Sequence, residues 1–306
     1  MKNARHALIL VLFLSLTGPS FAGLKVRVLT SIFPLKEFAA AVVGERGEVS
    51  LLLPPGAGVH TWQPRPGDIM RLASSDLFIS VGSGLEPWLD DVARAVPGGK
   101  LRTLEVSRGL PLLPGQADEP EEAGTRHDHG PLDPHIWLDF GLDATIIDRI
   151  VDSLSGIDPE GAAYFRKNGE TYKARLLKLD SRFREAFENC AGRRMVVAGH
   201  AAFGYLAKKY GLVQISLYGL SPDSQPRPKQ MMRVVDFCRR ENIRTVFFEA
   251  SVPPDLARTL AAEINGRVLV LNAGHNLTRE QVTKGVGFFD IMEENLRNLR
   301  EGLGCR

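Results

Sequence analysis

Three histidines beside predicted strand ends are the residues with the most evident chemistry. His60 follows a predicted strand at residues 49–53, and His200 lies at the turn after a predicted strand at residues 195–198. His135 lies before a long helical region. Ligands of open α/β sheets bind beyond the carboxyl ends of the strands, where His60 and His200 are placed. Three imidazoles that converge there would suit Zn²⁺.

The spacing of these histidines does not by itself define a site. His60 and His135 are 75 residues apart, and 65 residues separate His135 from His200. The sequence contains no HExxH or CxxC motif. A single loop histidine is more often a surface or capping residue than a ligand. The prediction therefore depends on the elements that bring the three together.

Two series of alternating strands and helices surround the histidines. The alternation predicts an α/β fold of two lobes, each a mainly parallel four-stranded sheet with flanking helices. In the first lobe we expect strands at 26–30, 49–53, 77–81 and 101–106 and helices at 34–43, 66–74 and 88–95. In the second we expect strands at 195–198, 213–218, 245–248 and 268–271 and helices at 202–210, 229–240, 255–264 and 279–303.

A long helix is predicted between the lobes. One apolar stripe at helical spacing joins Tyr172, Leu176, Leu179 and Phe183, and a helix from 159 to 187 would be about 43 Å long. We expect this single rigid helix to join the lobes, with the metal site in the cleft between them. The predicted domains are an N-terminal lobe (23–140), a helical linker (141–189) and a C-terminal lobe (190–306).

Composition and the N-terminal segment restrict the class of protein. The chain has 306 residues and a formal net charge of +2, which does not suit a nucleic-acid binder. Residues 1–22 resemble a signal peptide, with Lys2 and Arg5, an apolar run, and cleavage near Ala22. We expect an exported, soluble, periplasmic monomer.

The cysteines and one acidic segment leave alternatives open. In an oxidising compartment Cys305 could pair with Cys190 or with Cys238. We expect residues 116–131 to form an acidic loop that contains His127 and His129. This loop is either a solvated connection or an accessory metal-collecting loop.

Several motifs together resemble one family. In order along nearly the whole mature chain, they resemble those of periplasmic zinc and manganese solute-binding proteins of ABC transporters. The motifs are residues 58–66 (GVHTWQPRP), 84–89 (GLEPWL), 133–138 (DPHIWL), 199–205 (GHAAFGY), 221–226 (SPDSQP) and 246–249 (VFFE).

The resemblance implies a function and a ligand set. His60, His135 and His200 would bind the metal, and a histidine at the third position is similar to the zinc branch, because imidazole suits Zn²⁺ better than Mn²⁺. The protein would capture Zn²⁺ in the periplasm and deliver it to an inner-membrane ABC permease. A Mn²⁺ or Fe²⁺ protein of the same family is the nearest alternative.

The fourth ligand is where the sequence departs from the family. A run that often carries an Asp reads LNAGHN here, at residues 271–276. Water, Glu249, the Asn272 side chain and His275 are the alternatives. Glu249 is also a candidate for an anion behind the ligands, since three neutral imidazoles leave the full metal charge uncompensated.

Two proteins of other classes, a zinc hydrolase and a metal-stabilised adhesin, are the alternatives. A three-histidine zinc hydrolase would need a base such as Glu249, but no GxSxG motif is present and we expect no enzyme. A metal-stabilised adhesin would unfold when the metal is removed.

Overall fold

The computed structural model describes residues 25–96, 101–115, 132–217, 228–249 and 254–306. The predicted signal peptide, the acidic loop with His127 and His129, and the motif at 221–226 lie outside these ranges. In the described part of the chain, no helix has both the length and the apolar character that a membrane span requires.

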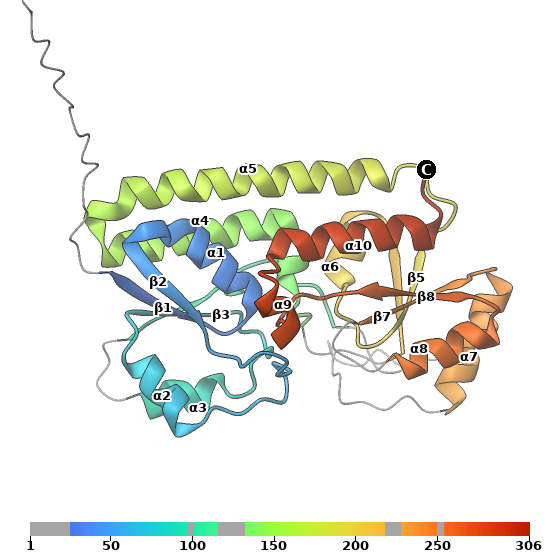
Figure 1. The fold of residues 1–306 in the computed structure, drawn as a ribbon, viewed down its shortest axis with the longest axis horizontal. Coiled ribbons are helices and arrows are strands. Elements are labelled where there is room, and N and C mark those ends of the chain that lie inside the picture. The colour runs from blue at the N-terminus through green and yellow to red at the C-terminus, as the bar shows by residue number, and fades with distance from the viewer. Residues whose placement is uncertain (1–24, 97–100, 116–131, 218–227, 250–253) are drawn as a thin grey trace, which may run out of the picture.

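The first lobe is a four-stranded parallel sheet in the order β2-β1-β3-β4 (Figure 1). Strand β3 is buried throughout, as expected for a central strand where helices cover both faces of a parallel sheet. The elements are β1 (Val26–Thr30), α1 (Phe33–Val43), β2 (Gly47–Leu51), α2 (Pro66–Ala73), β3 (Leu77–Ser80), α3 (Leu89–Ala95) and β4 (Arg102–Glu105). The short 3-10 helix Gly44–Arg46 precedes β2.

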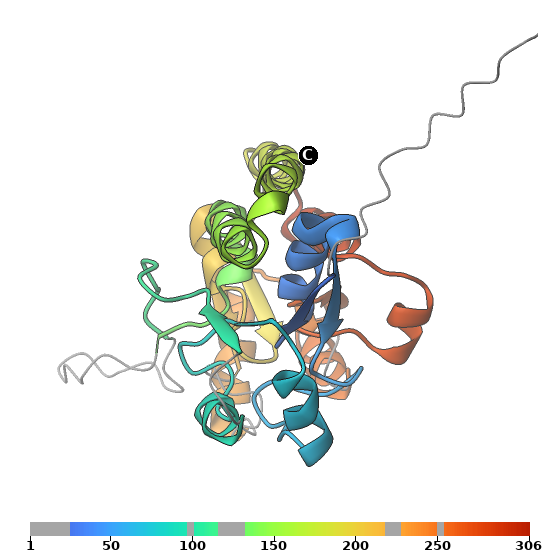
Figure 2. The ribbon, with the colours of Figure 1, turned by 90° about the vertical axis from the view of Figure 1, so that its left-hand side faces the viewer.

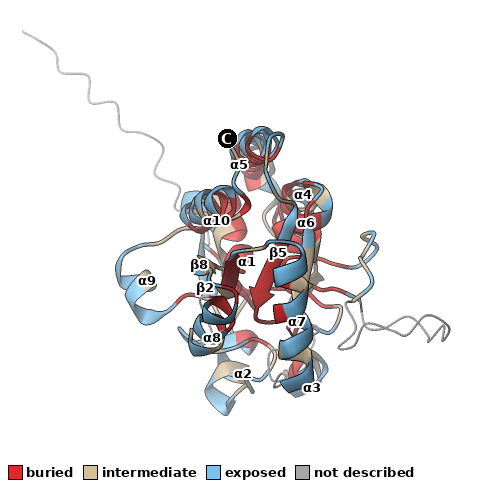
Figure 3. Cartoon of the chain, turned by 90° about the vertical axis from the view of Figure 1, so that its right-hand side faces the viewer, coloured by how far each residue is buried: buried red, intermediate tan, exposed pale blue. Residues whose placement is uncertain are grey.

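The second lobe repeats this topology. Its sheet is also parallel, in the order β6-β5-β7-β8, although the two lobes share no evident sequence repeat. Figure 3 shows β5 buried at the centre of this lobe and pale outer faces on α7 and α8. The elements are β5 (Arg194–Ala198), α6 (Gly204–Lys209), β6 (Val213–Ser216), α7 (Pro228–Arg240), β7 (Thr245–Glu249), α8 (Asp255–Glu263) and β8 (Arg267–Leu271). The prediction of two parallel four-stranded lobes is confirmed.

A helical pair braces the lobes. The 3-10 turn Pro159–Gly161 separates α4 (Phe140–Ile157) from α5 (Ala162–Ala186), and the two helices lie side by side (Figure 2). Helix α5 runs past both lobes (Figure 1). Its Asn168 side chain donates to Val42 O at 3.0 Å in the first lobe, and Tyr210 of the second lobe donates to Asp180 of α5 at 2.7 Å. The predicted connecting helix is therefore present.

The hydrophobic core also spans the lobes. One buried cluster contains residues of α1, α5, α10 and both sheets, among them Phe38, Phe183, Phe247 and Phe288. A smaller cluster lies between the second sheet and helices α7 and α8. Because one core crosses the lobe boundary, large hinge motion would expose apolar surface.

The C-terminal helix is broken, contrary to the prediction of one helix over 279–303. The structure has α9 (Arg279–Thr283) and α10 (Phe288–Leu303). Gly285 adopts φ +66°, which an α-helix cannot contain, and the side chain of Asp290 accepts the Gly287 N–H at 2.9 Å, starting α10 afresh.

The structure also shows which cysteine pairs with Cys305. Cys305 is bonded to Cys190, which joins the chain end after α10 to the segment that follows α5. Cys238 is a buried free thiol in α7, and burial raises its pKa to about 11.

Candidate metal centre

The three predicted histidines converge. His60 lies in the loop between β2 and α2, His200 follows β5, and His135 precedes the 3-10 helix Ile136–Leu138. Their ring centroids are 5.1 to 5.8 Å apart, and one ligand atom of each residue lies within 4.8 Å of the others. Each lobe thus contributes imidazoles to one point.

Carboxylates orient two of the rings. Nδ1 of His135 lies 2.8 Å from Asp133 Oδ1, and Nδ1 of His200 lies 2.5 Å from Glu249 Oε2. A neutral imidazole that donates through Nδ1 keeps its lone pair on Nε2. The Nε2 atoms of His135 and His200 are 3.2 Å apart, so two lone pairs face each other across the site. A cation between them would satisfy both.

The spacing fits zinc. Two nitrogens held 2.0–2.1 Å from one Zn²⁺ at the tetrahedral angle lie about 3.3 Å apart. The 3.2 Å between the His135 and His200 nitrogens is close to that value. Nε2 of His60 is buried and has no hydrogen-bond partner among the described residues, which leaves it available as the third nitrogen.

Burial favours the neutral form of two of these imidazoles, those of His60 and His135. Desolvation, reinforced by the neighbouring histidines, lowers the pKa of His60 to about 3. Desolvation also lowers the pKa of His135, although Asp133 opposes the shift. Since metal ligands must be deprotonated, both rings are ready to bind a cation at neutral pH.

The loop that carries His60 is anchored by two tryptophans. Trp88 Nε1 donates to Val59 O at 3.3 Å, and the Trp62 and Trp88 rings meet edge to face, with centroids 5.1 Å apart. The segment before His135 is held from the other lobe, because Tyr205 of α6 donates to Asp133 O at 3.0 Å. Packing against both lobes thus fixes the ligands before a metal arrives.

Sequence reasoning missed Asp133. Its carboxylate lies two residues before His135 and accepts the backbone N–H of His135 at 2.9 Å as well as facing the ring. The Asp-Pro-His run was the available signal. Together with Glu249, the predicted anion, Asp133 gives two carboxylates behind three imidazole rings, which balances the charge of a divalent cation.

Asn272 and His275, two candidates for the fourth metal ligand, have different surroundings. Asn272 Oδ1 accepts the Gly274 N–H at 2.8 Å and shapes the turn after β8. His275 is buried beside the trio, and its Nδ1 lies 3.9 Å from Glu249 Oε1. This Nδ1 atom has no hydrogen-bond partner among the described residues. Desolvation lowers the pKa of His275 to about 4. The structure therefore gives Asn272 a local structural contact and places His275 at the site.

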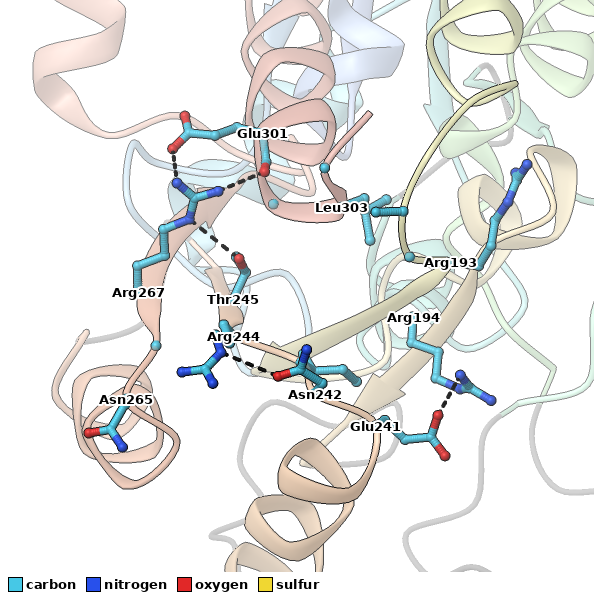
Figure 4. Close-up of a pocket in the computed structure, with 16 residues that line it drawn as sticks. Arg193, Arg194, Glu241, Asn242, Arg244, Thr245, Asn265, Arg267, Glu301 and Leu303 are labelled. Atoms are coloured by element: carbon cyan, nitrogen blue, oxygen red, sulfur yellow. Dashed lines mark hydrogen bonds and ion pairs between the residues drawn. The ribbon is translucent and has the colours of Figure 1, made fainter. Parts of the chain in front are cut away.

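A large cavity lies at the other end of the second sheet. It has a volume of about 680 Å³ and is lined by residues at the amino ends of β5, β7 and β8 (Figure 4). Two of its arginines are paired there, Arg194 with Glu241 and Arg267 with Glu301, each at 2.8 Å. The histidines lie at the opposite, carboxyl ends of these strands, so the cavity is separate from the candidate metal centre.

Two α/β lobes braced by a long helix, with buried imidazoles from both lobes, define the class of metal-binding solute-binding proteins. Residues 28–302 match the model of the family described as ZnuA, zinc-uptake complex component A, periplasmic, and the chain belongs to that family. Members of this family bind metal for uptake and are not enzymes, so the hydrolase alternative is set aside.

Individual relatives agree with this assignment. The chain is 34% identical over 284 residues to the high-affinity zinc uptake system protein ZnuA of Bacillus subtilis, covering 92% of this chain and 88% of that protein. It is 32% identical to the zinc-binding protein AdcA of Streptococcus pyogenes over 90% of this chain, which spans only 56% of AdcA. The Zn(II)-bound ZnuA-like domain of Streptococcus pneumoniae AdcA superposes with a TM-score of 0.78 at 29% identity, covering 91% and 99% of the two chains.

Proposed function

We propose that this protein captures Zn²⁺ in the periplasm through His60, His135 and His200 and delivers it to an inner-membrane ABC permease for zinc uptake. The observation that carries the proposal is the convergence of three imidazoles, two of them backed by carboxylates. The names of the relatives, a zinc uptake protein and a zinc-binding protein, support the choice of ion.

The donor set favours zinc over manganese. All three converging ligands are imidazole nitrogens, whereas Mn²⁺ prefers carboxylate and water oxygens. Both carboxylates beside the trio contact histidine Nδ1 atoms, so they compensate charge from behind the ligands. A fourth, tetrahedral position is then available to water or to His275.

Capture and delivery require a metal site that can also release the bound ion. The protein would act as a monomer that carries one ion between solution and the permease. Neutral ligands suit this role, because the bound cation is held without a direct carboxylate contact and can pass to a more strongly charged acceptor.

Metal analysis with matched variants tests the proposal. The purified protein should bind one Zn²⁺ in preference to Mn²⁺ and Fe²⁺ in competition titrations. Replacing His60, His135 or His200 with Ala should each weaken zinc binding strongly. The matched controls His127→Ala and His129→Ala should leave the main site unchanged. Equal zinc binding in all five variants would contradict the proposal.

A further inference from the structure

The chain between β8 and α9 crosses from the second lobe onto the first. We call residues 273–277 the strap. The backbone N–H of Phe33 donates to His275 O at 3.0 Å, that of Gly56 donates to Leu277 O at 2.8 Å, and Trp137 Nε1 donates to Ala273 O at 2.6 Å. The strap is thus bonded to three separate segments from earlier in the chain.

Asn276 adds a side-chain contact to these backbone bonds. Its Nδ2 donates to Pro54 O and to Ala57 O, both at 2.8 Å, and its Oδ1 accepts the Leu277 N–H at 2.8 Å. The amide orientation is fixed, because a flipped amide would place oxygen against two carbonyl oxygens. The other bonds use strap carbonyls that any residue supplies, whereas those from Nδ2 need this side chain.

The two carbonyls belong to the loop that carries His60. Pro54 to Ala57 form a tight turn, with Gly56 at φ +83° and the Ala57 N–H donating to Pro54 O at 3.1 Å. His60 follows three residues after Ala57. On its other side, Val59 is held by Trp88 of the first lobe. His60 therefore lies beside two anchors, one from its own lobe and one from the strap.

We propose that Asn276 is a positioning residue that ties the His60 loop to the strap and thereby slows release of the bound cation. The proposal rests on the proposed zinc-binding function of the trio. His200 and Glu249 belong to the second lobe, as does the strap. The two bonds from Asn276 therefore hold the His60 loop of the first lobe at a fixed position relative to His200. Breaking them removes no ligand but weakens the attachment of the loop to the strap, where the bond from the Gly56 N–H to Leu277 O remains.

An isosteric substitution isolates this contact. Asn276→Asp keeps the size of the side chain but turns its donor into a carboxylate oxygen that faces two carbonyls, and Asn276→Ala removes the contact without that repulsion. The matched control is Asn298→Asp, since Asn298 Nδ2 donates to Val270 O at 2.8 Å within the second lobe. Thermal unfolding of each variant, with and without zinc, establishes that it is folded.

Two measurements give the result. In stopped-flow release of Zn²⁺ into excess chelator, Asn276→Asp should release zinc about tenfold faster than wild type, with Asn276→Ala between them and Asn298→Asp unchanged. Association should change little. In the zinc-free protein, amide hydrogen exchange of residues 54–60 should be faster in both Asn276 variants and unchanged in the control.

The outcomes separate the two proposals. Wild-type release rates and loop exchange in both Asn276 variants would overturn the role of Asn276, while zinc binding would still stand. An equal acceleration in Asn298→Asp would also overturn it, because the effect would then reflect general loosening of the second lobe. Failure of the wild-type protein to bind zinc would overturn the proposed function, and with it the role of Asn276 in release, even if loop exchange responded as expected.

Discussion

Glu249 Oε2 lies 2.5 Å from His200 Nδ1, and both side chains are buried. Glu249 ends β7 and His200 follows β5, which are neighbouring strands of the second sheet. Because parallel strands end at the same edge, the sheet itself sets this distance. The carboxylate fixes the tautomer that directs Nε2 of His200 towards His135 and His60.

Removing the charge of Glu249 should weaken zinc binding without unfolding the protein. Glu249→Gln keeps the shape of the side chain but loses the anion behind His200, and loss of such a partner typically costs about 10- to 100-fold in metal affinity. Isothermal titration with a competing chelator measures the zinc affinity of the variant and of the wild type. The control is Glu241→Gln, which breaks an exposed ion pair with Arg194 at the far end of the sheet. Equal affinities in the two variants would contradict the assigned role.

Removing the metal should leave a folded protein. The hydrophobic cluster that spans both lobes contains no metal ligand, so its burial does not depend on zinc. Zinc should raise the melting temperature by mass action, with about 2.7 kcal/mol of stabilisation at a free concentration 100 times the Kd. Thermal unfolding with chelator shows whether the metal-free protein is folded, and the same measurement with added zinc gives the rise in melting temperature. A chelated protein that has lost its secondary structure would instead indicate a structural metal, as in the adhesin alternative.

Breaking the disulfide should affect stability and spare the metal centre. Cys190 and Cys305 are 115 residues apart, so their bond restricts the unfolded chain strongly. Replacing both with Ser should lower the free energy of unfolding by about 2–5 kcal/mol in denaturant titrations. Zinc stoichiometry should remain that of wild type, because this end of the second lobe is opposite the histidines. Cys238→Ser serves as the control for loss of a thiol.

Local patterns were enough to predict most of the fold. The strand predictions placed His60 and His200 after β2 and β5, since β-branched runs and their flanking turns depend on neighbouring residues. The start of β2 was two residues earlier than expected, because its exposed alternate residues weaken the apolar signal.

Contacts between distant residues were not predictable in the same way. The pairing of Cys305 with Cys190 depends on where α10 ends relative to α5, which no local pattern records. The placement of His275 beside Glu249 depends on the path of the strap, and that path follows from hydrogen bonds to residues more than 200 positions earlier. Sequence motifs predicted three histidines of the candidate site, and Glu249 was predicted as an anion behind them, whereas the role of Asp133 required the fold.

Acid should destabilise the zinc-free protein through its buried imidazoles. The pKa values of His60 and His275 are lowered to about 3 and about 4 in the folded state, against about 6.5 in an unfolded chain. Between these values the unfolded state binds more protons, so stability is greatest above pH 6.5 and is lost as the pH falls. Between pH 7.5 and pH 5, protonation of each ring in the unfolded chain should lower the free energy of unfolding by about 2 kcal/mol. Denaturant titrations at pH 7.5 and 5 in chelator measure this loss, and His60→Gln should reduce it by about 2 kcal/mol. A pH dependence that is unchanged in His60→Gln would show that this ring is not held neutral by burial.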